Sequence, residues 1–172
     1  MPRIIFLLTA LALLVGVNFT IYQREQLITT GRIVLLELAP VDPRSLMQGD
    51  YMALRFKLVA DAFPANQSRD LKDGELVLAV APDGVASFRR FHDTTPLAGD
   101  EALLRYRIRN QQPKLASNAF FFEEGHARDY DKARYGAFRV APDGDAILVA
   151  LHGEDRRPLG VPNIVGASAS AQ

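Results

Sequence analysis

The segment that precedes Tyr51 combines side chains that could carry out hydrolysis. Ser45 lies in this segment, and Gly49-Asp50 follows it directly before an apolar stretch typical of a strand. A serine becomes a nucleophile when a base removes its proton, and a neutral lysine can act as that base. The chain has four lysines, at Lys57, Lys72, Lys114 and Lys132. Because none of them lies in an apolar strand that would lower its pKa, we expect no catalytic residue and keep Ser45 as the alternative nucleophile.

The same loop also fits a docking surface for another protein. Gly49 permits a positive φ where the loop enters the strand, and Asp50 can accept hydrogen bonds from backbone N–H groups there. Two-residue alternation directs Tyr51 away from the face that carries Leu54 and Phe56. A structural loop that closes onto a core strand is the other interpretation. The candidate partner-binding residues are Asp42, Arg44, Gly49, Asp50 and Tyr51.

Three arginines alternate with apolar residues further along the chain. Arg105, Arg107 and Arg109 project from one face of a predicted strand. Such a face can bind an anionic partner or a lipid headgroup. It can equally be solvated, or paired with carboxylates such as Glu123 and Glu124 on a neighbouring strand.

The sequence gives no support for a metal or cofactor site. The chain has no cysteine, and His92, His126 and His152 lie far apart without the spacing of a metal-binding motif. His126 stands among acidic residues that are typical of the exposed start of a helix. Nucleotide-binding glycine loops are missing as well. We therefore expect no metal and no cofactor.

Composition restricts the class of protein to an ordinary globular domain with an anchor. The chain has 172 residues, of which 48% are hydrophobic and 23% are charged, and the formal net charge is zero. A nucleic-acid-binding domain normally has a basic excess, so no nucleic-acid partner is expected. The length allows one domain and a short additional segment.

That additional segment is an uncharged stretch near the N-terminus. Ile4 to Tyr22 contains nineteen residues without a charge. As a helix it would be about 28 Å long, close to the thickness of the hydrocarbon layer. A cleaved signal peptide is the rival interpretation, but the stretch lacks the small residues of a cleavage site. We predict a transmembrane anchor over residues 1–25, a β-rich domain over 26–159 and a disordered tail over 160–172.

Two identical turns organise the predicted domain. The sequence Val-Ala-Pro-Asp-Gly occurs at 80–84 and at 140–144, each time between apolar runs. Proline, aspartate and glycine in this order favour a hairpin turn. The similarity extends upstream, which suggests that 32–91 and 101–152 are duplicated halves; chance recurrence of a common turn is the other explanation. The predicted fold is mainly β, a sandwich or partly open barrel of about eight strands with one or two short helices, the best candidate being 124–135.

The stretch 41–56 resembles the bacterial GDYXXLXY family, which is named for Gly-Asp-Tyr-x-x-Leu-x-Tyr. Four of these positions match, at Gly49, Asp50, Tyr51 and Leu54. Phe56 replaces the final tyrosine and lacks its hydroxyl. Segments 120–125 and 135–140 resemble the second characteristic region of the family. The resemblance implies a single-anchor envelope protein that associates with multi-pass membrane proteins and has no settled biochemical activity.

A local similarity to the nucleophile region of signal peptidase I supports the alternative activity. Ser45 precedes Gly49-Asp50 and an apolar strand, as the peptidase nucleophile precedes its own. The sequence departs from that pattern at two points: no Met-x-Pro follows the serine directly, and the spacing to Gly49-Asp50 is shorter. These departures favour a shared strand geometry over a working Ser/Lys pair.

The sequence as a whole therefore predicts a non-catalytic, membrane-tethered interaction domain. We expect it in the inner membrane, with the domain facing the periplasm or the cell exterior and acting as an accessory partner of a multi-pass membrane protein. The alternatives are a membrane-tethered Ser/Lys hydrolase and a carrier of a small hydrophobic ligand.

Overall fold

The computed structural model describes residues 2–39, 47–48, 51–64 and 72–160. The first half of the chain contains α1 (Pro2–Thr30), β1 (Arg32–Glu37), β2 (Met47–Gln48), β3 (Tyr51–Ala53), α3 (Lys57–Ala62), β4 (Gly74–Val80) and β5 (Val85–Phe91). The second half contains β6 (Glu101–Arg109), β7 (Gln112–Lys114), β8 (Ala119–Phe121), the 3-10 helix η1 (Ala127–Tyr130), β9 (Tyr135–Val140) and β10 (Ala146–His152). Strands dominate the described part outside α1, so the prediction of a mainly β fold is confirmed.

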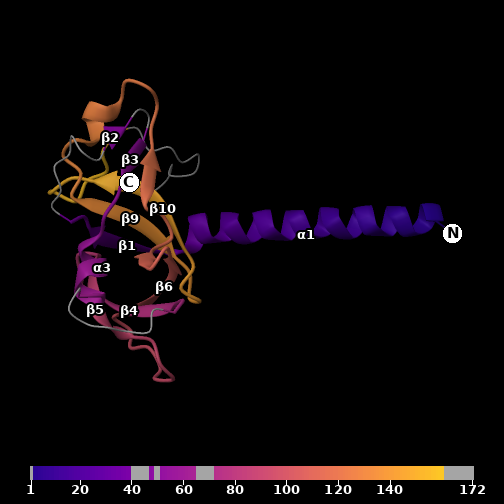
Figure 1. Ribbon diagram of the computed structural model, residues 1–172, viewed down its shortest axis with the longest axis horizontal. Coiled ribbons are helices and arrows are strands. Elements are labelled where there is room, and N and C mark those ends of the chain that lie inside the picture. The colour runs from indigo at the N-terminus through magenta and orange to yellow at the C-terminus, as the bar shows by residue number, and fades with distance from the viewer. Residues whose placement is uncertain (1, 40–46, 49–50, 65–71, 161–172) are drawn as a thin grey trace, which may run out of the picture.

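Helix α1 extends away from the β-rich body (Figure 1). Its apolar side chains are exposed over most of its length, as at Phe6, Leu13 and Phe19. Counting only the residues that the structure describes, no helix is long and apolar enough to cross a membrane. Near its C-terminal end the helix packs on the body through Leu27, which is buried. Arg139 of β9 donates a hydrogen bond of 2.8 Å to the carbonyl of Gly31, directly after the helix.

Seven strands form one sheet in the order β10-β9-β1-β5-β4-β6-β7. β1 lies between β9 and β5, antiparallel to the first and parallel to the second. The sheet curls, so that β6 comes round towards the β9–β10 hairpin (Figure 1). A backbone hydrogen bond of 2.8 Å from Arg105 of β6 to Gly144 of that hairpin spans the remaining opening. The result is a strongly curled half-barrel.

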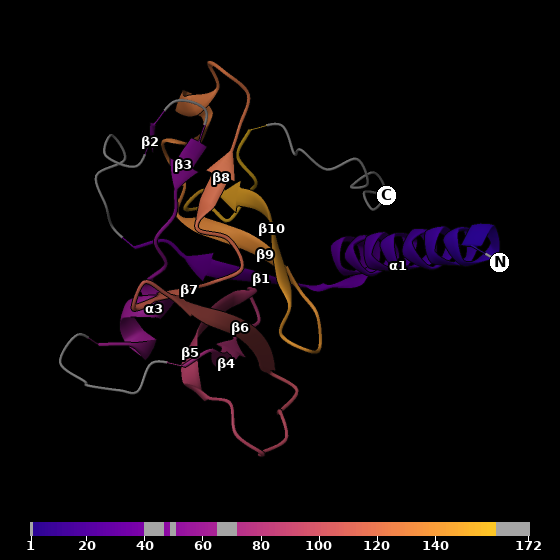
Figure 2. The same ribbon diagram turned by 45° about the vertical axis from the view of Figure 1, so that its right-hand side comes forward.

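A second sheet of three strands, β2-β3-β8, stands beside the curled sheet (Figure 2). Tyr51 pairs with Phe121 and Met52 pairs with Phe120. Alternation predicted a strand that includes Leu54 and Phe56, whereas β3 ends at Ala53 and α3 begins at Lys57. The apolar face of that segment is nevertheless buried, because α3 packs Leu58 against the same core.

Both predicted hairpins form with the same backbone geometry. Gly84 has φ +83° and Gly144 has φ +82°. In each turn the aspartate side chain accepts a hydrogen bond of 3.1 Å from the N–H two residues later. The first glycine carbonyl accepts a hydrogen bond of 2.9 Å from Leu35 of β1, and the second accepts the bond from Arg105 of β6. The duplication itself stays a prediction, and these paired contacts agree with it.

The concave side of the curled sheet is filled by apolar side chains. Phe138, Leu36, Leu76 and Leu104 are completely or almost completely buried. Phe56 packs edge-on against Phe138 at a ring distance of 5.4 Å. The helix predicted over 124–135 is wrong in length and type: only the 3-10 helix η1 forms. Gly125 has φ +87°, which keeps the start of the segment out of a helix, and Tyr135 already belongs to β9.

Candidate functional site

The three-stranded sheet holds the part of the motif segment that the structure describes. Tyr51 is half-buried, and its ring lies 5.8 Å from that of Phe121. The neighbouring side chains Met52 and Leu54 point into the core, as alternation requires. The N–H of Leu54 donates a hydrogen bond of 2.7 Å to the carbonyl of Asn118, directly before β8. This bond continues the pairing of β3 with β8 by one residue.

The remaining residues of the predicted loop site lie outside the described residues. They are Asp42, Arg44, Ser45, Gly49 and Asp50. The structure thus places Tyr51 alone among the predicted partner-binding residues. What it adds beside Tyr51 is Phe121, whose side chain is 70% exposed.

An apolar groove adjoins Phe121 and runs along one side of α1. We call it the ribbon groove, after the narrow three-stranded sheet whose strand β8 forms one wall. Its volume is about 1060 Å³. Its apolar lining includes Ile21, Ile28, Phe121, Ile147 and Val149. Helix α1, β8 and the outer strand β10 therefore meet around one open, apolar surface.

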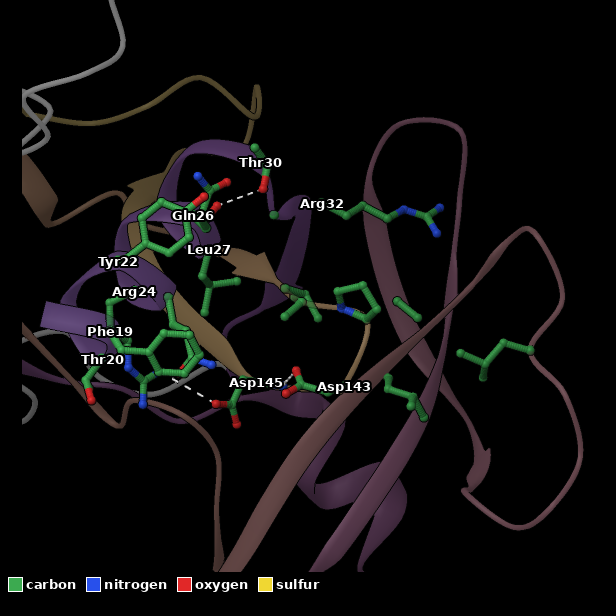
Figure 3. Close-up of a pocket in the computed structure, with 18 of the residues that line it drawn as sticks. Phe19, Thr20, Tyr22, Arg24, Gln26, Leu27, Thr30, Arg32, Asp143 and Asp145 are labelled. Atoms are coloured by element: carbon green, nitrogen blue, oxygen red, sulfur yellow. Dashed lines mark hydrogen bonds and ion pairs between the residues drawn. The ribbon is translucent and has the colours of Figure 1, made fainter. Parts of the chain in front are cut away.

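A second groove lies on another side of α1, against the β9–β10 hairpin (Figure 3). We call it the base groove; its volume is about 950 Å³. Phe19, Tyr22 and Arg24 of the helix line it, and Asp143 and Asp145 of the hairpin face them. The guanidinium of Arg24 lies 3.7 Å from the Asp145 carboxylate.

The arginine strand face has carboxylate neighbours. Arg105 binds the carboxylate of Asp145 and lies 3.6 Å from that of Glu75. Arg109 lies 3.4 Å from the Asp73 carboxylate, while Arg107 is exposed. From the sequence, Glu123 and Glu124 were expected as the neighbouring carboxylates. In the structure the carboxylates come from β4, from the residue directly before β4 and from the turn between β9 and β10. Strand pairing, which the sequence alone does not give, decides which acids face a strand.

The described lysine nearest the motif in sequence is not prepared to act as a base. The Lys57 ammonium donates a hydrogen bond of 3.1 Å to the Glu37 carboxylate. This hydrogen bond, with the attraction of the same carboxylate, raises the pKa of Lys57 above its ordinary value. A Ser/Lys hydrolase needs the opposite, a lysine whose pKa is lowered so that it is neutral.

The histidines take part in local contacts. His126 lies 2.8 Å from the Asp129 carboxylate, and this hydrogen bond raises the pKa of the imidazole. His152 lies 2.7 Å from the carbonyl of Arg156. Within the described part of the chain, no three histidine, aspartate or glutamate side chains come together as a metal site.

Comparison with known protein families gives a match over most of the chain. The sequence model of the family described as GDYXXLXY protein matches residues 13–151. The chain belongs to this family. Of the motif positions that the structure describes, Leu54 and Phe56 are buried and Tyr51 lies on the three-stranded sheet. Comparison with curated proteins gives no match, and comparison with solved structures gives none either.

In this GDYXXLXY protein, phenylalanine in place of tyrosine at the last motif position has a physical explanation. Phe56 is 3% exposed and is surrounded by apolar groups, with its ring against Phe138. A tyrosine hydroxyl there would need a buried hydrogen-bond partner. Phenylalanine keeps the packing without that requirement.

The two grooves and the exposure of Phe121 were not predicted from the sequence. A signal for Phe121 was present, because alternation in Phe120-Phe121-Phe122 directs the middle ring to the opposite side from its neighbours. Phe120 and Phe122 both contact Tyr130, at ring distances of 5.0 and 5.5 Å. The grooves left no sequence signal, since they arise where α1 meets strands far away in the chain.

Proposed function

We propose that this GDYXXLXY protein is a non-catalytic, membrane-tethered interaction domain that assembles with a multi-pass membrane protein. We further propose that the domain faces the periplasm or the cell exterior. The observation that supports this function best is the exposed ring of Phe121. It lies beside motif residue Tyr51 and at the edge of the apolar ribbon groove.

The tether is supported by the character of α1. The uncharged stretch of the sequence runs from Ile4 to Tyr22, and the side chains of Ile4 and Leu7 are outside the described set. The described apolar side chains from Ile5 onward are mostly more than half exposed to solvent. A row of exposed apolar residues of this length would be unfavourable in water, whereas a bilayer would cover it.

The docking role is supported by the position of the ribbon groove. Its lining begins at Thr20 and Ile21, at the end of the uncharged stretch. A transmembrane helix of a partner that packs beside α1 would therefore reach the groove where it leaves the bilayer. Exposed aromatic side chains next to an apolar groove are typical anchors of protein interfaces.

The hydrolase alternative has less support. The raised pKa of Lys57 opposes a role as general base. The carrier alternative requires an empty apolar interior, whereas the concave face of the sheet is occupied by buried rings and leucines such as Phe138 and Leu104. We therefore retain the interaction domain.

Co-purification from native membranes in mild detergent tests the proposal. Phe121→Ala removes an exposed ring and should leave the fold intact, so a multi-pass protein present in stoichiometric amount with the unaltered chain should be lost. Ile33→Ala is the matched control, because Ile33 is also exposed and apolar but lies on β1, outside the lining of the ribbon groove. Equal recovery of the partner with the two variants would contradict the proposal.

A further inference from the structure

The base groove changes in character along α1 (Figure 3). Phe19 and Tyr22 line it at the membrane end of the proposed anchor. Arg24 follows Tyr22 by two positions, and Gln26 and Thr30 lie beyond. Aromatic rings followed by polar and cationic groups are typical of the layer where lipid headgroups meet the hydrocarbon. Along α1 the groove thus changes from apolar to polar in the same direction in which a lipid changes from acyl chains to headgroup.

The height of Arg24 fits the phosphate layer of a bilayer. It follows Tyr22, the last residue of the uncharged stretch, by two positions, which corresponds to about 3 Å along a helix. The polar layer on each side of a bilayer is about 5–7 Å thick. An anchor that ends at Tyr22 therefore places the Arg24 guanidinium among lipid phosphates.

Arg24 and Asp145 lie across the groove from each other without a hydrogen bond between them, and the Asp145 carboxylate accepts one from Arg105 instead. Arg24 and Asp145 approach to 3.7 Å, which is longer than a hydrogen bond, and both side chains are partly exposed. The Asp143 carboxylate lies beside them in the groove wall and accepts a hydrogen bond from the N–H of Asp145. Because Arg105 pairs with Asp145, the Arg24 guanidinium and the Asp143 carboxylate are left to complement a ligand that carries an anion and a cation side by side.

Other charged side chains of the groove are directed to protein partners. Arg32 donates a hydrogen bond of 3.1 Å to the carbonyl of Glu101. The carboxylate of Glu101 accepts hydrogen bonds from Arg90 and from the N–H of Ala98. Asp145 is likewise paired with Arg105. The charges that face the open space are therefore mainly those of Arg24 and Asp143.

We propose that the base groove binds the headgroup of an aminophospholipid, phosphatidylethanolamine. The phosphate pairs with Arg24, the ammonium donates a hydrogen bond to the carboxylate of Asp143, and the acyl chains lie along Phe19. This inference rests on the proposed function, because it needs α1 in a bilayer. Phosphatidylcholine has no N–H to donate to the carboxylate, and phosphatidylglycerol has no cation for it, so both should bind more weakly.

Lipid retention by the full chain tests this site. The chain is reconstituted into nanodiscs that contain phosphatidylcholine with a minor share of phosphatidylethanolamine or phosphatidylglycerol, and bound lipid is measured by native mass spectrometry. We expect phosphatidylethanolamine to be enriched about tenfold over phosphatidylcholine, as for one or two charge-assisted hydrogen bonds. Arg24→Gln and Asp143→Asn should each remove most of this enrichment. The asparagine can still accept the hydrogen bond of the turn, so the hairpin should be preserved.

The controls are Arg157→Gln and Asp155→Asn, which change the same charges on the exposed turn after β10, outside the lining of the base groove. Both should retain phosphatidylethanolamine like the unaltered chain. Equal retention of the three lipids by inserted protein would overturn the proposal. Equally tight binding of soluble glycerophosphoethanolamine would overturn the assignment to a lipid.

Insertion is measured first, by resistance to alkaline extraction from vesicles. A chain that is extracted contradicts the proposed membrane tether. A chain that resists extraction but shows no lipid preference contradicts the headgroup site alone. The two failures are therefore distinguishable.

Discussion

The β4–β5 and β9–β10 hairpins turn through the same five residues, 80–84 and 140–144, and differ in what surrounds them. A side chain added at Gly84 would meet no atom within 4 Å, whereas one at Gly144 would lie 3.2 Å from the backbone nitrogen of Arg105. The first turn is held by Arg156, at 2.7 Å from Asp83. The second closes the curled sheet and forms a wall of the base groove.

The same turn sequence therefore has two different structural roles in this protein. The turn residues define the backbone geometry, which is the same in the two hairpins. The neighbours define the role: an exposed turn in one case, and in the other a contact between β6, β9 and α1. Substitutions at the two turns and at their neighbours should therefore have unequal effects on stability.

Alanine at the two turn glycines should separate the hairpins most clearly. Gly84→Ala should cost about 1–2 kcal/mol of unfolding free energy, because alanine resists a positive φ. Gly144→Ala should cost about 2–4 kcal/mol, since the new methyl group also crowds Arg105 and Leu103. Urea denaturation of the detergent-solubilised chain measures both. Equal losses would show that the closure at Gly144 contributes nothing beyond the turn.

Removal of the arginine that holds each turn should give a smaller difference. Arg105→Gln should cost about 1 kcal/mol, because Arg105 is partly buried and has two carboxylate neighbours. Arg156→Gln removes one exposed ion pair and should cost at most about 0.5 kcal/mol. The same denaturation curves measure these losses. A larger effect of Arg156→Gln would reverse the ranking of the two hairpins.

Acid should loosen the attachment of the first hairpin to β6. Glu101 of β6 accepts a hydrogen bond from the N–H of Ala98 and ion pairs from Arg89 and Arg90 of β5. These contacts lower the pKa of Glu101, so their stabilisation is complete above its unfolded pKa and is lost as the pH falls through the folded value.

Hydrogen exchange of the β5 amides between about pH 6 and pH 3 measures this loosening. Glu101→Gln should remove most of the pH-dependent change in protection after correction for intrinsic exchange. An unchanged profile in that variant would assign the effect to other carboxylates. The β10 amides provide the internal comparison, because the Glu101 carboxylate has its contacts on the β5 side.

The smallest effect is expected at Ser45, which lies outside both hairpins. Ser45→Ala should leave labelling by a serine-reactive probe and recovery of the membrane partner unchanged, since no serine nucleophile is proposed. Loss of labelling in that variant alone would favour the hydrolase and would contradict the non-catalytic function.

Several elements could be predicted because their signals are local. Alternation identified the buried face of Met52, Leu54 and Phe56, and the Pro-Asp-Gly order identified both turns. The predicted helix near His126 is only η1, which begins after Gly125 with its positive φ and ends before β9. Of the predicted loop site only Tyr51 can be placed, beside an exposed Phe121 that the sequence pattern had not marked as a site.

Local sequence patterns were sufficient to predict the mainly β character, the hairpin turns, the apolar α1 and membership of the GDYXXLXY family. These depend on residues close together in the chain, through side-chain periodicity and backbone preference. Only the tertiary structure decided that β1 lies between β9 and β5, that Arg105 meets Asp145, and that α1 is flanked by two grooves. Such contacts join segments up to about a hundred residues apart, as between Gly31 and Arg139. Their partners are chosen by packing of the whole chain, which no local pattern encodes.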